Sequence, residues 1–226
     1  GDEWRSLKDY VAALKPNQTA IYYIAGDDIA RLKASPHLEG FRARGVEVLL
    51  LPDPVDTFWV MSGLGFDGKP FKSVTQGAPD LALIPLLDTA KEQPAEIAEA
   101  VKQFLVFLQG TLGDAVTQVR ASDRLIDSAV CLVAPDSGPD RALERILAGA
   151  GRLSSASKPI LEVNPRHELI TALAGLGEGD REFKEDAAHL LFDEARLRDG
   201  ERPGDAKAFS DRLARVLGRG LRQPQA

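Results

Sequence analysis

Cysteine is nearly absent from this sequence of 226 residues, in which Cys131 stands alone. A single cysteine excludes an intrachain disulfide and is typical of proteins from a reducing compartment. Long apolar runs are missing as well. The candidates at residues 46–51 and 104–108 fall far short of the ~18 residues that a membrane-spanning helix needs. We therefore expect a cytoplasmic protein without a membrane partner.

An excess of basic residues is also missing, because 28 Lys and Arg face 34 Asp and Glu, for a net charge of −6. This balance argues against nucleic acid as a partner. Apolar residues make up 44% and charged residues 27% of the chain, which favours a globular protein with one large domain or two modest ones. The start shows no charged-then-apolar leader, so we expect no secretory signal. Gly1 at the first position has the character of a cut end, so we interpret the sequence as a piece of a longer protein.

Few residues in the sequence form a pattern typical of a catalytic or metal-binding site. The three histidines have no metal-ligand spacing: His37, His167 and His189. Three aspartates that precede expected helices are predicted to be N-caps rather than acid–base groups: Asp53, Asp180 and Asp205. Neither a P-loop nor a nucleophile elbow occurs in the sequence. We therefore predict no catalytic residue, no metal site and no cofactor site.

One glycine motif needs separate treatment, because Gly63, Gly65 and Gly68 fit G-x-G-x-x-G. In a dinucleotide site this motif joins a strand to a helix whose N-terminus holds the pyrophosphate. Here it follows an expected helix and precedes an expected strand, so we favour a glycine-rich turn. A nucleotide-binding α/β enzyme built on Gly63–Gly68 is the alternative function.

The first 76 residues alternate between helix and strand patterns. Strands are expected at 21–25, 46–51 and 71–75. Helices are expected with Ser6 and Asp27 as N-caps, from Pro36, and over 54–64. This alternation predicts an α/β part with a small, mainly parallel sheet covered by helices. Residues 77–93 hold two prolines, with Pro94 at their edge, and no periodicity, so we interpret them as a linker.

Residues 94–226 predict a second, α+β part. Its expected strands are 115–121, 129–134 and 159–163, and its expected helices are 94–108, 139–148, 164–176, 180–198 and 205–219. The last two helices carry apolar stripes past a glycine-rich break. These stripes either dock on their own domain or pair with a second copy of the chain as a four-helix bundle. The sequence leaves both arrangements open.

Two other helices carry apolar side chains of interest. In helix 54–64 one face holds Phe58 and Trp59 and a second face is also apolar, so the outer face is either buried in the chain or an accessible patch. Helix 139–148 carries Leu143, Ile146 and Leu147 between loose flanks. Core packing is favoured for it, with a recognition element as the alternative.

Several blocks along the chain, in the same order, resemble the ninety-kilodalton heat-shock chaperone family in its bacterial form. They are Ser6-Leu7-Lys8-Asp9-Tyr10-Val11, Ile21-Tyr22-Tyr23-Ile24, Ser35-Pro36-His37-Leu38-Glu39, Gly45-Val46-Glu47-Val48-Leu49, Phe66-Asp67-Gly68-Lys69-Pro70-Phe71, Val119-Arg120-Ala121-Ser122-Asp123-Arg124-Leu125 and Leu161-Glu162-Val163-Asn164-Pro165-Arg166-His167. These blocks span nearly the whole chain.

The resemblance implies a domain assignment. Residues 1–76 match the last α/β part of the family's middle domain, 77–93 the linker, and 94–226 the C-terminal dimerisation domain. The family's ATP-binding domain has no counterpart here. The resemblance therefore implies that this piece is not itself an enzyme, and that ATP and Mg²⁺ belong to the full-length protein.

The resemblance also implies two contact surfaces. The partners are a second copy of the chain and unfolded or partly folded client proteins. Client-binding residues are implied at Phe58, Trp59, Leu143, Ile146 and Leu147. The dimer interface is implied at Phe183, Leu190, Leu191, Phe209, Leu213, Val216 and Leu217. Unlike methionine-rich relatives, the chain has Met61 alone, and it lacks the acidic tail of eukaryotic cytosolic members.

Overall fold

The computed structural model describes residues 5–77, 81, 83–87, 96–149, 151–152 and 157–221. These residues divide into two compact units. The first draws on Gly1–Gln93, Asp123–Ile126 and Val133–Ser157, and the second on Pro94–Ser122, Asp127–Leu132 and Lys158–Ala226. Residues 133–157, expected in the C-terminal domain, thus pack with the first unit. Most of the expected linker 77–93 and the tail 222–226 lie outside the described residues, so the domain boundary stays a prediction.

A three-stranded parallel sheet forms the centre of the first unit, as the sequence predicts. Strand β1 (Ile21–Ala25) lies between β2 (Leu49–Leu51) and β3 (Phe71–Ser73), and both neighbours run parallel to it. Strand β2 is shorter than the expected 46–51. The amide of Val46 donates to the carbonyl of Phe41 at 2.9 Å, so this end of the apolar run closes the preceding helix instead of joining the sheet.

Helices cover both faces of this sheet, and every residue of β1 is therefore buried. Tyr22 and Ile24 share one apolar cluster with side chains of α2 (Ile29–Lys33), the 3₁₀ turn η1 (Pro36–Leu38) and α3 (Glu39–Arg42). The alternate residues Tyr23 and Ala25 point the other way. They pack with Val60 of α4 (Pro54–Met61) and Ala142 of α6 (Arg141–Gly149).

Side-chain caps fix several helix starts. Ser6 and Asp9 form a capping box at α1 (Leu7–Ala12), and Asp53 and Asp205 cap their helices as predicted. Two expectations were wrong. Asp28 rather than Asp27 caps α2. Asp180 sits at the N-cap position of α8 but makes no cap hydrogen bond, because its carboxylate bonds Arg219 instead.

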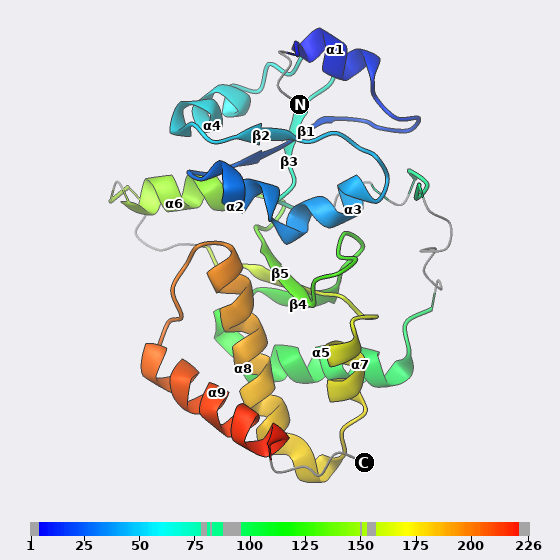
Figure 1. Cartoon of the computed structure of the whole chain (residues 1–226). Helices are drawn as coiled ribbons and strands as arrows, with labels where there is room; N and C mark the ends of the chain where they lie inside the picture. Colours follow the sequence, from blue (N-terminus) through cyan, green and yellow to red (C-terminus); the bar gives the residue numbers. More distant parts are fainter. Residues whose placement is uncertain are drawn as a thin grey trace. The chain divides into compact units, whose positions relative to one another are not determined.

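The described part of the second unit combines a second three-stranded sheet with the α-helices that Figure 1 labels α5, α7, α8 and α9. The strand order is β4 (Gln118–Ala121), β6 (Ile160–Val163), β5 (Val130–Val133), and β4 and β6 are parallel. The helices are α5 (Glu99–Leu112), α7 (Glu168–Ala174), α8 (Arg181–Arg198) and α9 (Ala206–Gly220), with short 3₁₀ turns η3 (Gly113–Ala115) and η4 (Glu178–Asp180). Side chains of α5, α7 and α8 pack with the strands in one apolar core. Among the described residues, no helix has the length and apolar character to cross a bilayer.

Candidate interaction surfaces

Helix α4 has a buried inner face and an apolar outer face. Asp53 accepts a hydrogen bond from the amide of Val55 at 2.9 Å, and Pro54 stands at the first helical position. The side chains that face the sheet, Thr57 and Val60, are buried. On the outside, Phe58 keeps 55% and Val55 69% of its surface exposed. The structure thus favours the accessible patch over burial within the unit.

Trp59 is held more firmly than Phe58. Its ring lies 5.0 Å from that of Phe71, centroid to centroid, in a tilted arrangement on the edge of the sheet. Even so, 45% of Trp59 is exposed. The two aromatic side chains therefore differ: one is anchored by a ring partner, and the other projects from the helix.

Helix α6 is fixed at its start by a buried polar pair. Asp140 accepts from the amide of Leu143 at 2.9 Å and from the hydroxyl of Tyr23 at 3.2 Å. Burial raises the pKa of Tyr23, and the neighbouring carboxylate of Asp140 raises it further. This pair attaches the first turn of α6 to the central strand β1.

The three apolar residues expected on α6 are not equivalent. Leu143 is buried, with 4% of its surface exposed, whereas Ile146 and Leu147 are half-buried. Leu143 thus follows the core-packing interpretation. Ile146 and Leu147 remain partly accessible.

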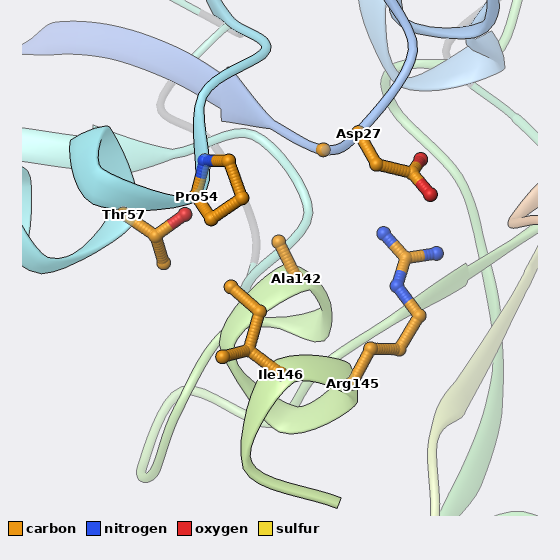
Figure 2. Close-up of a pocket in the computed structure, with 7 residues that line it drawn as sticks. Asp27, Pro54, Thr57, Ala142, Arg145 and Ile146 are labelled. Atoms are coloured by element: carbon orange, nitrogen blue, oxygen red, sulfur yellow. The ribbon is translucent and has the colours of Figure 1, made fainter. Parts of the chain in front are cut away.

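A pocket of about 220 Å³ lies where α6 meets the start of α4. Its wall is formed by Gly26, Asp27, Pro54, Thr57, Ala142, Arg145 and Ile146. Figure 2 shows Ala142 and Ile146 directed toward Pro54, with the guanidinium of Arg145 facing the carboxylate of Asp27 at one side. Apart from these two charged side chains, the pocket is lined by small or apolar groups.

In the second unit, α8 docks on its own core. Leu191 is 3% exposed and belongs to the apolar core, and Phe183 is partly buried against the same core. Leu190 is half-buried. Of the dimer residues expected on α8, Leu191 therefore has its packing partners within the chain.

Helix α9 behaves differently. All its residues are described and none is buried. Phe209 and Val216 are half-buried, while Leu213 and Leu217 are 38% and 59% exposed. The apolar side chains at these four positions recur at helical spacing, so they form one stripe along the helix.

Ion pairs connect α9 to α8, which lie side by side (Figure 1). The Arg215 guanidinium donates to both carboxylate oxygens of Asp186, at 2.7 and 2.6 Å. These hydrogen bonds hold the pKa of Asp186 below its usual range. Arg219 bonds Asp180 and lies over the ring of Phe183, 4.3 Å from its centroid.

Sequence reasoning missed these ion pairs. Arg215 and Arg219 near the end of α9 fit the helix dipole, which gave no reason to seek partners on α8. The i, i+4 spacing of Arg215 and Arg219 places both on one face of α9, but their partners Asp186 and Asp180 do not repeat that spacing. The sequence therefore offers no matching pattern that signals these pairs.

The glycine motif forms a turn, as favoured. Gly63, Gly65 and Gly68 all have positive φ. Phe66 and Lys69 exchange two backbone hydrogen bonds of 2.9 Å. The segment leads from α4 into strand β3, so it places no helix N-terminus behind the glycines.

Neither a metal ligand set nor a reactive thiol stands out in the described part of the chain. A search of those residues finds no group of three or more His, Cys, Asp or Glu side chains that could hold an ion. Cys131 is buried. The features with functional potential in this part of the chain are apolar surfaces and pockets.

Comparison with known proteins adds independent information. A family model described as Hsp90 protein matches residues 1–226. The chain is 67% identical over 222 residues to the chaperone protein HtpG of Nitrobacter winogradskyi, which covers 98% of this chain and 35% of that protein. It is 63% identical over 221 residues to HtpG of Mesorhizobium japonicum and 57% identical over 222 residues to HtpG of Rhizobium meliloti, again with 98% and 35% coverage. The chain thus spans about a third of the length of these curated relatives.

Proposed function

We propose, from the premise that this chain belongs to the Hsp90 family, that it forms the part of an ATP-driven folding chaperone that dimerises and contacts client proteins. In this proposal, ATP and Mg²⁺ bind elsewhere in the full-length protein, and the piece has no hydrolytic activity of its own. Its partners are a second copy of the chain and partly folded clients in the cytoplasm.

The observation that carries the proposal is the apolar stripe of α9. A helix at the edge of a unit normally buries its apolar side against that unit. Here ion pairs of Arg215 and Arg219 join α9 to α8, while Leu213 and Leu217 stay exposed. A second α8–α9 pair packed against the first would cover both side chains in a four-helix bundle.

The outer face of α4 supports client contact. Val55, Phe58 and Trp59 expose apolar surface on neighbouring turns of one helix, and clustered exposure of this kind marks interaction sites. Partly folded proteins offer apolar side chains that would be buried on binding there. In this proposal Ile146 and Leu147 extend the same surface on α6, and Leu143 supports it from within.

Sedimentation equilibrium of the chain tests the dimer. We expect a mass near twice 24.4 kDa that persists on dilution. The double variant Leu213→Asp with Leu217→Asp should sediment as the monomer, because each carboxylate would lose hydration in the bundle. Val106→Asp is the matched control, since Val106 is 74% exposed on α5 of the same unit. A monomeric wild-type chain, or a double variant that remains dimeric, would contradict the proposal.

Binding of a labelled, permanently unfolded polypeptide tests client contact. Phe58→Ala should weaken binding with little change in melting temperature, because 55% of Phe58 is exposed. Trp59→Ala should also lower the melting temperature, since it removes the packing on Phe71. Unchanged binding in both variants would remove α4 from the client surface.

Titration calorimetry with ATP and with NAD separates this function from the nucleotide-binding alternative. The Gly63–Gly68 segment turns into a strand, so the backbone amides of a helix start are not directed at a phosphate. We expect no heat of binding at micromolar nucleotide. Micromolar affinity would favour the enzyme instead.

A further inference from the structure

Aspartate followed directly by glycine occurs twice in the chain, at Asp67-Gly68 and at Asp199-Gly200. In such a pair the backbone nitrogen of the glycine can attack the side-chain carboxyl of the aspartate, because glycine has no side chain that shields its nitrogen. The two pairs lie in different backbone surroundings, and these surroundings decide how readily each can react.

Asp67 and Gly68 are the two central residues of a tight turn in the glycine motif. Phe66 and Lys69 flank them and exchange two backbone hydrogen bonds of 2.9 Å. Both central residues have positive φ, 50° for Asp67 and 71° for Gly68, as a type I′ turn requires. Asp67 thus occupies the left-handed region, which few residues other than glycine, asparagine and aspartate adopt.

The two groups that would react are both accessible. Asp67 and Gly68 are exposed, and among the described residues none accepts a hydrogen bond from the Gly68 amide or pairs with the Asp67 carboxylate. A Cβ added at Gly68 would meet no atom within 4 Å, so the nitrogen stands in open space.

The peptide between Asp67 and Gly68 can also rotate without the loss of a hydrogen bond, since both bonds of the turn join Phe66 to Lys69. Rotation of this peptide converts a type I′ turn into type II′, in which φ stays positive at the first central residue and becomes negative at the second. Gly68 accepts either sign of φ. The rotation turns the Gly68 nitrogen toward the side chain of Asp67, where it can react.

The second pair lacks this freedom. Asp199 is the C-cap residue of α8, with φ −75° and ψ −4°. The Gly200 amide donates to the carbonyl of Leu197 at 3.0 Å. The next amide, that of Glu201, donates to the carbonyl of Arg196 at 2.9 Å. Attack by the Gly200 nitrogen would break the first of these bonds and disturb the end of the helix.

We infer that Asp67-Gly68 is a site of spontaneous covalent modification, at which aspartate converts to isoaspartate in the folded protein. The Gly68 nitrogen forms a bond to Cγ of Asp67, and its proton leaves with the carboxyl hydroxyl as water, which gives a five-membered succinimide. Water then cleaves one of the two bonds from this nitrogen to a carbonyl carbon. Cleavage at Cγ restores aspartate, whereas cleavage at the main-chain carbon leaves a backbone that runs through Cβ and Cγ. No electrons are transferred, and water is the sole co-reactant.

Isoaspartate would lengthen this turn. It adds one carbon to the backbone between Phe66 and Lys69, so their two hydrogen bonds cannot both keep their geometry. The turn leads into β3, in which Phe71 pairs with Ile21 of β1. We therefore expect the modified chain to melt at a lower temperature than the unmodified one.

Peptide mapping after prolonged warm incubation of the whole folded chain tests the inference. Isoaspartate is identified by fragmentation of each peptide and by methyl transfer from S-adenosylmethionine with an isoaspartyl methyltransferase. We expect it to accumulate at Asp67 at least about fivefold faster than at Asp199, the factor that corresponds to one backbone hydrogen bond. In urea, where neither turn persists, the two rates should converge.

Two asparagine variants give a second readout. Asp67→Asn keeps a residue type that tolerates positive φ and forms the same succinimide with loss of ammonia. Its product has a carboxylate in place of the amide, so conversion is followed by mass. Asp199→Asn is the matched control, and in the folded chain it should convert several-fold more slowly than Asp67→Asn.

Equal rates at the two sites of the folded chain, or faster conversion at Asp199, would overturn the inference. Conversion at Asp67 in urea alone would overturn it as well, because the folded turn would then protect the site. Neither dimerisation nor client binding enters these measurements. The inference therefore stands or fails independently of the proposed function.

Discussion

The carboxylate of Asp186 on α8 receives both of its strong hydrogen bonds from one side chain, the guanidinium of Arg215 on α9. Only 8% of Asp186 is exposed, and Arg212 approaches the same carboxylate to 3.8 Å. Two-point pairing of this kind fixes the orientation of both groups. It holds α9 on α8 while Leu213 and Leu217 of the apolar stripe of α9 stay exposed.

Asp186→Asn should therefore loosen the α8–α9 pair. The amide keeps the shape of the side chain but removes the charge and presents a donor to Arg215. We expect the melting temperature to fall by a few degrees. Asp211→Asn is the control, because Asp211 pairs with Lys207 inside α9 at 2.6 Å in an exposed i, i+4 contact, and such pairs contribute little. Equal effects of the two substitutions in a thermal melt would show that the Asp186 pair is not structural.

The sequence predicted the local part of this arrangement and missed the tertiary part. The buried run Ile21–Ala25 and the caps Ser6, Asp53 and Asp205 follow from nearest neighbours along the chain, so pattern and capping rules found them. Pairing between Asp186 and Arg215 joins residues on different helices. It depends on how these helices lie together, which periodicity does not specify.

The placement of α6 shows the same limit. Its amphipathic pattern fits either an accessible recognition helix or a core helix. The hydrogen bond from the hydroxyl of Tyr23 to the carboxylate of Asp140 attaches the start of α6 to β1. These two residues are far apart in sequence, so the pattern of α6 alone does not reveal the contact. The sequence marked Leu143, Ile146 and Leu147 as one group, and the contacts of α6 bury Leu143 alone.

The stability of the second unit should depend on pH through His189. Burial lowers the pKa of His189, and the nearby charge of Arg212 lowers it further, against the opposing carboxylates of Asp193, Asp186 and Glu185. In the unfolded chain, His189 takes up its proton near its ordinary pKa of about 6.5. Because the folded state binds that proton less readily, stability is lost as the pH falls below about 6.5.

His189→Gln should remove this component. The free energy of unfolding of the variant should fall less than that of the wild type between about pH 7.5 and about pH 5.5. The depressed pKa of Asp186, caused by Arg215, acts only in a lower window, since its contribution persists above the unfolded value of about 3.9. Urea unfolding at a series of pH values measures both. Parallel pH profiles for wild type and variant would exclude His189 as the source.

Two helical glycines should respond to alanine in opposite directions. Gly110 lies inside α5, and an added Cβ would meet no atom within 4 Å. Alanine there should raise the free energy of unfolding by about 1 kcal/mol, because glycine is that much less favourable in a helix interior. Gly40 also lies in a helix, α3. There the added Cβ would sit 2.7 Å from the carbonyl oxygen and 2.8 Å from the Cα of Arg124.

Both of these contacts are with backbone, so they cannot be relieved by rotation of a side chain. The backbone at Arg124 is itself held, because its buried guanidinium donates to the carbonyls of Val74 and Gly77. Gly40→Ala should therefore destabilise the first unit although it improves helix propensity, and Gly110→Ala serves as its matched control. Urea unfolding of the two variants decides the point. If Gly40→Ala were as stable as the wild type, the backbone at Arg124 would be able to shift with little loss of free energy. That result would contradict its fixed position beside α3.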